Sequence, residues 1–282
     1  MWQHHSIIAN GIRLHFVTQG EGPLMLMLHG FPEFWYSWRH QIPEFAAQYK
    51  VVALDLRGYN ESEKPADLSA YTMSQLIADV KGVITELDYD RCVLVGHDWG
   101  GAIAWSFAGV YPALVERLIV MNLPHPAKFA EAFQTGNLQQ ILRSWYVLAF
   151  QLPWLPEWVL QQNDYQLISE MLQGSAAQPA AFTAADLAQY RQAIAQPGAL
   201  TAALNYYRNA FSSLTQGQTR TVLPMPTLLI WGEQDVALGK ELTYGTEQYV
   251  RDLQIRYIPD SGHWVQQEQP ALVNQYMHQF LA

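Results

Sequence analysis

The pentapeptide GHDWG, at residues 96–100, constrains the fold of this chain more than any other feature. It stands between an apolar run, residues 91–95, and a helix-like stretch, residues 101–111. Strand, sharp turn and helix in this order predict a nucleophile elbow, a strained turn that holds one side chain above the end of a sheet. The small residues Gly96 and Gly100 allow the strand and the helix to approach closely.

Asp98 occupies the tip of this turn, where serine is the usual residue. A carboxylate that attacks a saturated carbon forms an ester, and water can hydrolyse an ester again. A serine in the same reaction would form an ether and lose its reactivity after one turnover. Asp98 therefore predicts displacement at an sp³ carbon, as in an epoxide or an alkyl halide.

Short apolar runs alternate with amphipathic helical segments along most of the chain. One helix is expected from Thr72 to Leu87, with a capping box between Thr72 and Gln75. The alternation predicts an α/β fold with a mostly parallel central sheet and helices on both faces. The expected strands are residues 13–17, 24–28, 50–54, 91–95, 118–121, 227–231 and 254–258.

Residues 125–217 break this alternation. They contain no convincing strand and are rich in glutamine, alanine and aromatic residues. A helix start is expected at Thr183-Ala184-Ala185-Asp186, and Pro197-Gly198 is expected to end that helix. Because the segment is too long for a loop, we predict an inserted helical cap domain. Residues 1–124 and 218–282 would then form the core domain.

Two further residues complete a predicted catalytic triad with Asp98. Asp235 follows the run 227–231, and His263 follows the run 254–258, so both lie where parallel strands end. His263 is expected to take a proton from water, while Asp235 fixes its tautomer. Asp260, three residues before His263, is a rival for the acid, but its position is more typical of a solvated turn residue.

The environment of Asp98 can also be predicted. The backbone N–H groups of Phe31 and Trp99 are expected to form an oxyanion hole for hydrolysis of the Asp98 ester. His97 and His29 flank the site in sequence and are interpreted as hydrogen-bonding scaffold groups. An apolar, aromatic-lined pocket is expected, and the residues assigned to it are His29, Pro32, Phe150, Trp154 and Trp264.

Four linked motifs now identify a resemblance: HGFPEFWYSWRHQIP, DLRGY, VGHDWGG and SGHWVQQEQP, starting at residues 29, 55, 95 and 261. Together they resemble the soluble epoxide hydrolase branch of the α/β-hydrolase superfamily, over essentially the whole chain. The resemblance implies that two cap tyrosines, Tyr146 and Tyr207, donate hydrogen bonds to the epoxide oxygen. Tyr206 is an adjacent alternative, but neighbours on a helix point about 100° apart. Asn60 stands where this family commonly has glycine, and asparagine tolerates a left-handed backbone.

Three function classes remain open at this point. The resemblance favours epoxide hydrolysis without a cofactor, giving a vicinal diol through an aspartyl ester. A hydrolytic dehalogenase would use the same triad. Fluoroacetate-type dehalogenases typically carry arginine at the position of Trp99, and haloalkane dehalogenases often carry asparagine at that of Phe31. A ligand-binding protein without turnover would not need a complete triad.

Bulk properties argue against several other classes. The net charge is −9 and there is no run of Lys or Arg, which argues against nucleic acid and anionic membranes as partners. Cys92 is the single cysteine and is expected to pack as a small hydrophobe in a reducing compartment. The amino terminus lacks the pattern of a signal peptide, so we expect a cytoplasmic protein. We also expect a monomer or a homodimer.

No metal site is expected, because His4, His5 and His40 have no sequence partners for metal ligation and are interpreted as surface residues. Asp55 and Arg57 are expected to form a structural ion pair.

Overall fold

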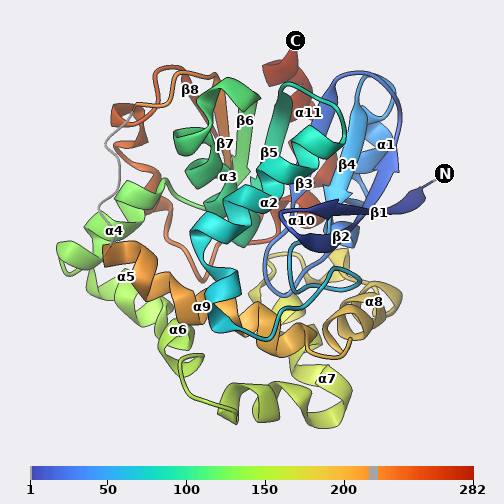
Figure 1. Ribbon diagram of the computed structural model, residues 1–282. Coiled ribbons are helices and arrows are strands. Elements are labelled where there is room, and N and C mark those ends of the chain that lie inside the picture. The colour runs from blue at the N-terminus through green and yellow to red at the C-terminus, as the bar shows by residue number, and fades with distance from the viewer. Residues whose placement is uncertain (1, 216–221) are drawn as a thin grey trace.

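The computed structural model describes residues 2–215 and 222–282, which form one eight-stranded sheet surrounded by helices (Figure 1). The strand order is β1-β2-β4-β3-β5-β6-β7-β8. Strands β1 and β2 pair antiparallel, β2 pairs antiparallel with β4, and all later pairs are parallel. The strands are β1 (Gln3–Ala9), β2 (Ile12–Gln19), β3 (Leu24–Leu28), β4 (Lys50–Leu54), β5 (Cys92–His97), β6 (Val115–Met121), β7 (Thr227–Gly232) and β8 (Leu253–Ile258).

The predicted α/β fold is confirmed, and each predicted strand is present within a few residues of its expected bounds. Strands β3, β4 and β5 form the centre of the core, and nearly every side chain on them is buried. Cys92 is buried at the start of β5, as a small apolar side chain would be. Continuous apolar runs are typical of parallel strands that are covered on both faces.

Strand β1 was not predicted. Its sequence, QHHSIIA, is largely polar, and most of its side chains are exposed. It lies at the edge of the sheet and pairs only with β2, so one edge of its backbone is unpaired (Figure 1). An edge strand of this kind shows little apolar periodicity, because most of its side chains face solvent and the hydrogen-bond ladder to β2 helps to hold it in place.

Helices cover both faces of the sheet, as predicted. Helices α2 and α3 pack on one face, whereas α1 and α11 lie on the other (Figure 1). The predicted capping box at Thr72 is wrong, because the Thr72 hydroxyl pairs with the Ser74 hydroxyl instead. The helices outside the segment between β6 and β7 are α1 (Gln41–Phe45), α2 (Met73–Glu86), α3 (Trp99–Val110), α10 (Val265–Glu268) and α11 (Pro270–Leu281).

The described part of the segment between β6 and β7 forms helices and no strand. In Figure 1 these helices lie together at one end of the sheet. The capping box between Thr183 and Asp186 is present, and the helix that it starts ends before Pro197. The predicted boundary between residues 217 and 218 lies outside the described residues. The helices are α4 (Pro126–Gln134), α5 (Leu138–Arg143), α6 (Trp145–Ala149), α7 (Leu155–Ser175), α8 (Ala184–Ile194) and α9 (Ala199–Thr215).

Across residues 2–215 and 222–282, every helix is too short or too polar to cross a lipid bilayer.

Candidate active site

Asp98 lies in a strained turn between β5 and α3. Its backbone has φ 49° and ψ −121°, a conformation that costs free energy for a residue with a side chain. A Cβ atom at Gly96 would collide with the Gly100 carbonyl, and one at Gly100 would collide with the Leu28 carbonyl. Both glycines are therefore required for the close approach of strand and helix. The turn projects the Asp98 carboxylate beyond the carboxyl ends of β3 and β5.

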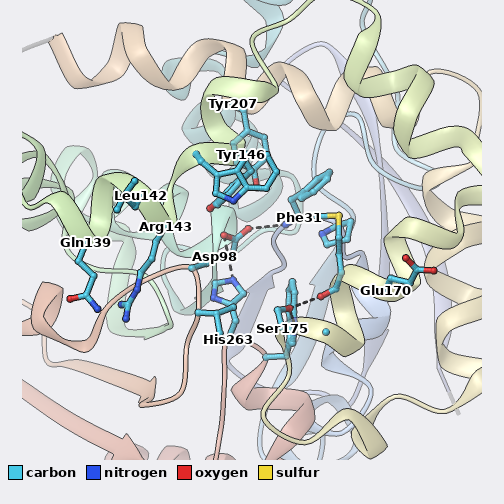
Figure 2. A pocket seen from close by; sticks show the side chains of 17 residues that line it. Phe31, Asp98, Gln139, Leu142, Arg143, Tyr146, Glu170, Ser175, Tyr207 and His263 are labelled. Carbon is cyan, nitrogen blue, oxygen red and sulfur yellow. Dashed lines mark hydrogen bonds and ion pairs between the residues drawn. The ribbon is translucent and has the colours of Figure 1, made fainter.

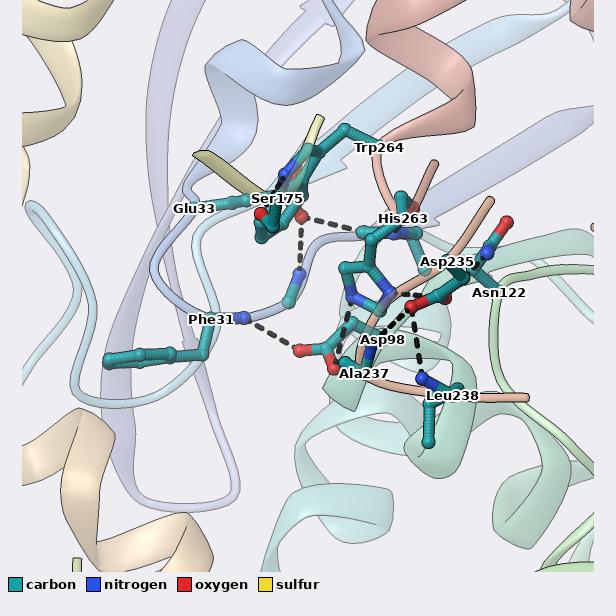
Figure 3. A network of polar contacts seen from close by, with 12 residues as sticks. Phe31, Glu33, Asp98, Asn122, Ser175, Asp235, Ala237, Leu238, His263 and Trp264 are labelled. Atoms are coloured by element: carbon teal, nitrogen blue, oxygen red, sulfur yellow. Dashed lines mark hydrogen bonds and ion pairs between the residues drawn. The ribbon is translucent and has the colours of Figure 1, made fainter. Parts of the chain in front are cut away.

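His263 lies between Asp98 and Asp235. Its Nδ1 is 2.7 Å from Asp235 Oδ2, and its Nε2 is 3.6 Å from Asp98 Oδ2 (Figure 3). An ionised Asp235 carboxylate can only accept a hydrogen bond, so the proton between the two groups is on His263 Nδ1. The imidazole is thereby oriented with Nε2 facing Asp98, an arrangement that matches the geometry expected of an Asp-His-Asp triad.

Asp235 is held rigidly in the turn after β7. Its Oδ1 accepts hydrogen bonds from the Ala237 and Leu238 N–H groups, and its Oδ2 also accepts one from Asn122 Nδ2 at 2.7 Å. The rival acid, Asp260, is exposed, and its backbone carbonyl accepts from Gln178. Of these two candidate acids, Asp235 is the one placed to orient His263.

The Phe31 backbone N–H donates to Asp98 Oδ1 at 2.8 Å (Figure 3). Trp99 is the first residue of α3, where a backbone N–H has no acceptor within the helix. Both positions fit donors to an oxyanion that develops on Asp98 Oδ1. The other carboxylate oxygen, Oδ2, faces His263.

A buried hydrogen-bond network, which the sequence did not predict, holds the backbone of His263. His97 Nε2 lies 2.8 Å from the His263 carbonyl oxygen, and His97 Nδ1 lies 2.8 Å from Glu33 Oε2. Glu33 also accepts from Gly30 N–H and from the side-chain amides of Gln266 and Gln267. This network fixes the backbone that carries His263, in agreement with a scaffold role for His97.

The signals for the missed groups were present in the sequence. Glu33 lies in the HGFPE motif, and Asn122 directly follows the apolar run of β6, where ligand-binding residues are expected. Each of these two residues is a single polar residue in an apolar stretch of sequence. The fold is needed to show that the two side chains are buried and which groups they contact.

Tyr146 and Tyr207 face Asp98 from the side opposite His263 (Figure 2). Tyr146 comes from α6 and Tyr207 from α9, and their ring centroids are 5.9 Å apart. The neighbouring Tyr206 points elsewhere, because its hydroxyl donates to the Arg57 carbonyl oxygen at 2.7 Å. Of the two adjacent tyrosines, Tyr207 is the one that lines the cavity.

A cavity of about 650 Å³ extends to both sides of Asp98 (Figure 2). Most of its wall is apolar, which suits an apolar substrate. Pro32 and Trp264 line it together with Phe31, Asp98, Tyr146, Tyr207 and His263. The lining residues that the sequence analysis did not name are Gln139, Leu142, Arg143, Trp145, Glu170, Met171, Gly174, Ser175, Val236 and Ala237.

Three predicted pocket residues lie outside this lining. The prediction for Trp154 is wrong: its side chain is 70% exposed on the outside of the helical segment, beside Trp158. Phe150 is buried behind the lining, with its ring against Tyr207. His29 is fully buried, and its Nε2 accepts from the Leu56 N–H, so it is a scaffold group.

The predicted ion pair between Asp55 and Arg57 is also wrong. Arg57 donates to both oxygens of Asp79 on α2 at 2.6–2.7 Å. Asp55 instead accepts from Asn60 Nδ2 and lies 2.6 Å from His15 Nδ1. Asn60 has φ 42°, so asparagine does occupy a left-handed backbone position at this turn.

The charges of the site are strongly coupled. Burial raises the pKa of Asp98, but the hydrogen bond and charge of His263 outweigh burial and lower it. Burial lowers the pKa of His263, but the carboxylates of Asp235 and Asp98 outweigh it and hold the pKa well above its ordinary value. Burial and the charge of Asp98 raise the pKa of Tyr146 and of Tyr207. The site therefore combines ionised carboxylates, a protonated imidazole and neutral phenols.

Comparison with known proteins agrees with this geometry. The family model described as alpha/beta hydrolase fold matches residues 23–270. Epoxide hydrolase 4 of Mus musculus is 43% identical over 279 residues, which cover 96% of this chain and 77% of that protein. An AB hydrolase superfamily protein of Bacillus subtilis is 40% identical over 276 residues, covering 97% of this chain and 96% of that protein.

Solved structures show the same relationship. The crystal structure of Bacillus megaterium epoxide hydrolase in complex with an inhibitor superposes with a TM-score of 0.90 and 36% identity. The match covers 98% of this chain and 99% of that one. The chain therefore belongs to the α/β-hydrolase fold family and, within it, to the epoxide hydrolase family.

Proposed function

We propose that this enzyme converts small apolar epoxides into vicinal diols through an ester on Asp98. One observation carries the proposal: the Asp98 carboxylate lies between His263 on one side and the hydroxyls of Tyr146 and Tyr207 on the other (Figure 2). The residues between β6 and β7 would act as a cap that brings the two tyrosines over the nucleophile.

In the first step, Asp98 Oδ2 attacks an epoxide carbon and forms the ester C–O bond. The ring C–O bond breaks, and its electron pair leaves on the epoxide oxygen. That alkoxide is strongly basic, so it takes a proton from Tyr146 or Tyr207. The raised pKa of both phenols keeps them protonated, and hence able to donate, in neutral solution.

Ester formation removes the negative charge of Asp98, so His263 releases its Nε2 proton to solvent. In the second step, the neutral Nε2 removes a proton from water, and the resulting hydroxide attacks the Asp98 carbonyl carbon. The oxyanion that forms on Oδ1 is held by the N–H groups of Phe31 and Trp99. Collapse of the intermediate releases the diol, whose departing oxygen takes the proton from His263. The proton of the regenerated Asp98 carboxyl passes to the tyrosinate through solvent. His263 regains from solvent the proton that it released, so the sum is epoxide plus water giving diol.

The test compares two products from the same enzyme. Incubation with a panel of small aromatic and aliphatic epoxides is expected to give vicinal diols, measured by chromatography. A matched panel of bromoalkanes is expected to release much less halide, because proton donation by the two phenols accelerates departure of a basic alkoxide but adds little for a weakly basic halide. Asp98→Ala should form neither product. Halide release that exceeds diol formation would assign the site to a hydrolytic dehalogenase instead.

The two steps should also respond differently to pH. Asp98 is uncharged in the ester, so one source of the raised pKa of His263 is lost and that pKa falls. Below this lower pKa the imidazole is protonated and cannot take a proton from water, so ester hydrolysis slows as the pH falls. Ring opening continues, because the lowered pKa of Asp98 keeps the carboxylate ionised.

We therefore expect the esterified fraction of the enzyme to rise from a minor species at about pH 8 to the main species at about pH 5. Acid quenching during turnover, followed by intact-protein mass spectrometry, measures this fraction directly. Accumulation of ester at alkaline rather than acidic pH would contradict the assignment of His263 as the base of the second step.

A further inference from the structure

His4 and His15 bring two ring nitrogens together at the edge of the sheet. Strands β1 and β2 pair antiparallel with Ser6 opposite His15, which places the side chains of His4 and His15 diagonally on the same face. His4 Nδ1 lies 3.1 Å from His15 Nε2. The sequence alone predicted no partner for His4, because His15 is remote in the chain and only the register of the hairpin joins them.

Glu61 provides a third ligand atom at the same place. It lies in the loop after β4, and its Oε2 is 4.0 Å from His15 Nε2. The three atoms lie within 4.8 Å of one another. The Glu61 side chain is 59% exposed, so it can change rotamer and move closer to the two nitrogens at little cost.

A buried carboxylate orients the ring of His15. His15 Nδ1 is 2.6 Å from Asp55 Oδ2, and both side chains are almost completely buried. Asp55 is itself fixed, because its Oδ1 accepts from the Trp35 N–H and its Oδ2 accepts from Asn60 Nδ2. An ionised carboxylate can only accept a hydrogen bond, so His15 keeps its proton on Nδ1 and directs the lone pair of Nε2 toward His4.

We propose that His4 Nδ1, His15 Nε2 and the Glu61 carboxylate bind a divalent transition-metal ion such as Zn²⁺, with water as the fourth ligand. Ligands at about 2.0–2.1 Å from tetrahedral zinc are about 3.3 Å apart, close to the separation of the two nitrogens. The contact between His15 and Asp55 is the carboxylate–histidine pair that orients metal-bound imidazoles. Two imidazoles and a carboxylate suit Zn²⁺ better than Mg²⁺ or Ca²⁺, which prefer oxygen ligands alone.

The bound ion would join three segments of the chain. His4 lies on the edge strand β1, His15 on β2, and Glu61 on the loop after β4. Within the sheet, β1 pairs only with β2, so the ion would add a direct link between this edge strand and the loop after β4. The site lies on a part of the fold that contributes no residue to the cavity around Asp98, so its role would be structural.

Isothermal titration of tag-free, chelator-treated protein with ZnCl₂ tests the proposal. We expect one equivalent of Zn²⁺ to bind and the melting temperature to rise with zinc concentration, since an ion that binds the folded state stabilises it. His4→Gln and Glu61→Gln should each weaken zinc binding by at least about tenfold. Both positions are exposed, so both variants should fold.

His5→Gln is the matched control. His5 is exposed on the opposite face of β1, where its ring stacks on Phe16 with centroids 5.5 Å apart. This variant should bind zinc as the wild type does and show the same rise in melting temperature. If His4 and His15 share only a hydrogen bond, the wild type will bind no stoichiometric zinc, and that result overturns the proposal. Equal loss of binding in His4→Gln and His5→Gln would also overturn it.

Discussion

His263→Gln is expected to stop the reaction at a covalent ester on Asp98. The substitution removes the base that activates water but leaves the nucleophile and both phenol donors in place. Ring opening should therefore continue, whereas hydrolysis of the ester should slow by roughly 10²–10⁴-fold, the usual contribution of a positioned general base. Glutamine also removes the imidazole without introducing a charge beside Asp98 and Asp235.

Mass spectrometry of this variant with excess epoxide is the measurement. The intact protein should gain one substrate mass, and peptide mapping should place that mass on the peptide that contains Asp98. Combining His263→Gln with Asp98→Ala should abolish the adduct. An unmodified Asp98 peptide, or an adduct on another residue, would contradict the proposed mechanism.

Wild-type turnover in ¹⁸O-labelled water gives an independent check. Water attacks the carbonyl carbon of the ester, so one labelled oxygen should be incorporated into Asp98 during repeated turnover.

Removing both tyrosine hydroxyls should nearly abolish ring opening. Tyr146 and Tyr207 converge on one side of Asp98, so they are expected to share the emerging alkoxide and to be partly redundant. We expect Tyr146→Phe and Tyr207→Phe each to reduce the rate of ester formation about tenfold, and the double variant to reduce it by about 10²–10⁴-fold. The His263→Gln background allows this rate to be measured directly, because the ester accumulates there.

Tyr206→Phe is the matched control for this experiment. It removes a hydroxyl from the adjacent residue of the same helix, but that hydroxyl donates to the Arg57 carbonyl oxygen away from Asp98. Its effect should be on stability rather than on ring opening. Trace halide release from a bromoalkane should fall much less than ring opening in the double variant. A double variant that opens epoxides at nearly the wild-type rate would remove the tyrosines from the mechanism.

The parts of the protein that the sequence predicted well are those in which local pattern and burial agree. The continuous apolar runs of β3, β4 and β5 predicted buried parallel strands, and the glycines around Asp98 predicted the elbow. Asp235 and His263 could be selected because functional residues follow the carboxyl ends of such strands. Each of these inferences depends on a few consecutive residues.

Other features depend on contacts between residues that are far apart in the chain. The exposed position of Trp154 follows from how the helices between β6 and β7 pack, which a local motif does not contain. Arg57 pairs with Asp79 rather than Asp55 because α2 brings Asp79 beside it, while Asp55 already has His15 and Asn60 as partners. The polar edge strand β1 was missed for the same reason.

The sequence by itself therefore determined the α/β fold, the strained turn at Asp98 and the choice of its two partners, because short-range sterics and the periodicity of burial specify them. Only the tertiary structure decided which buried groups hold His97. It also placed Tyr207 beside Asp98 and turned the adjacent Tyr206 away, as the resemblance had implied. It also decided that His4 meets His15. Each of these depends on strand register or helix packing, where residues remote in sequence become neighbours and compete for the same partners.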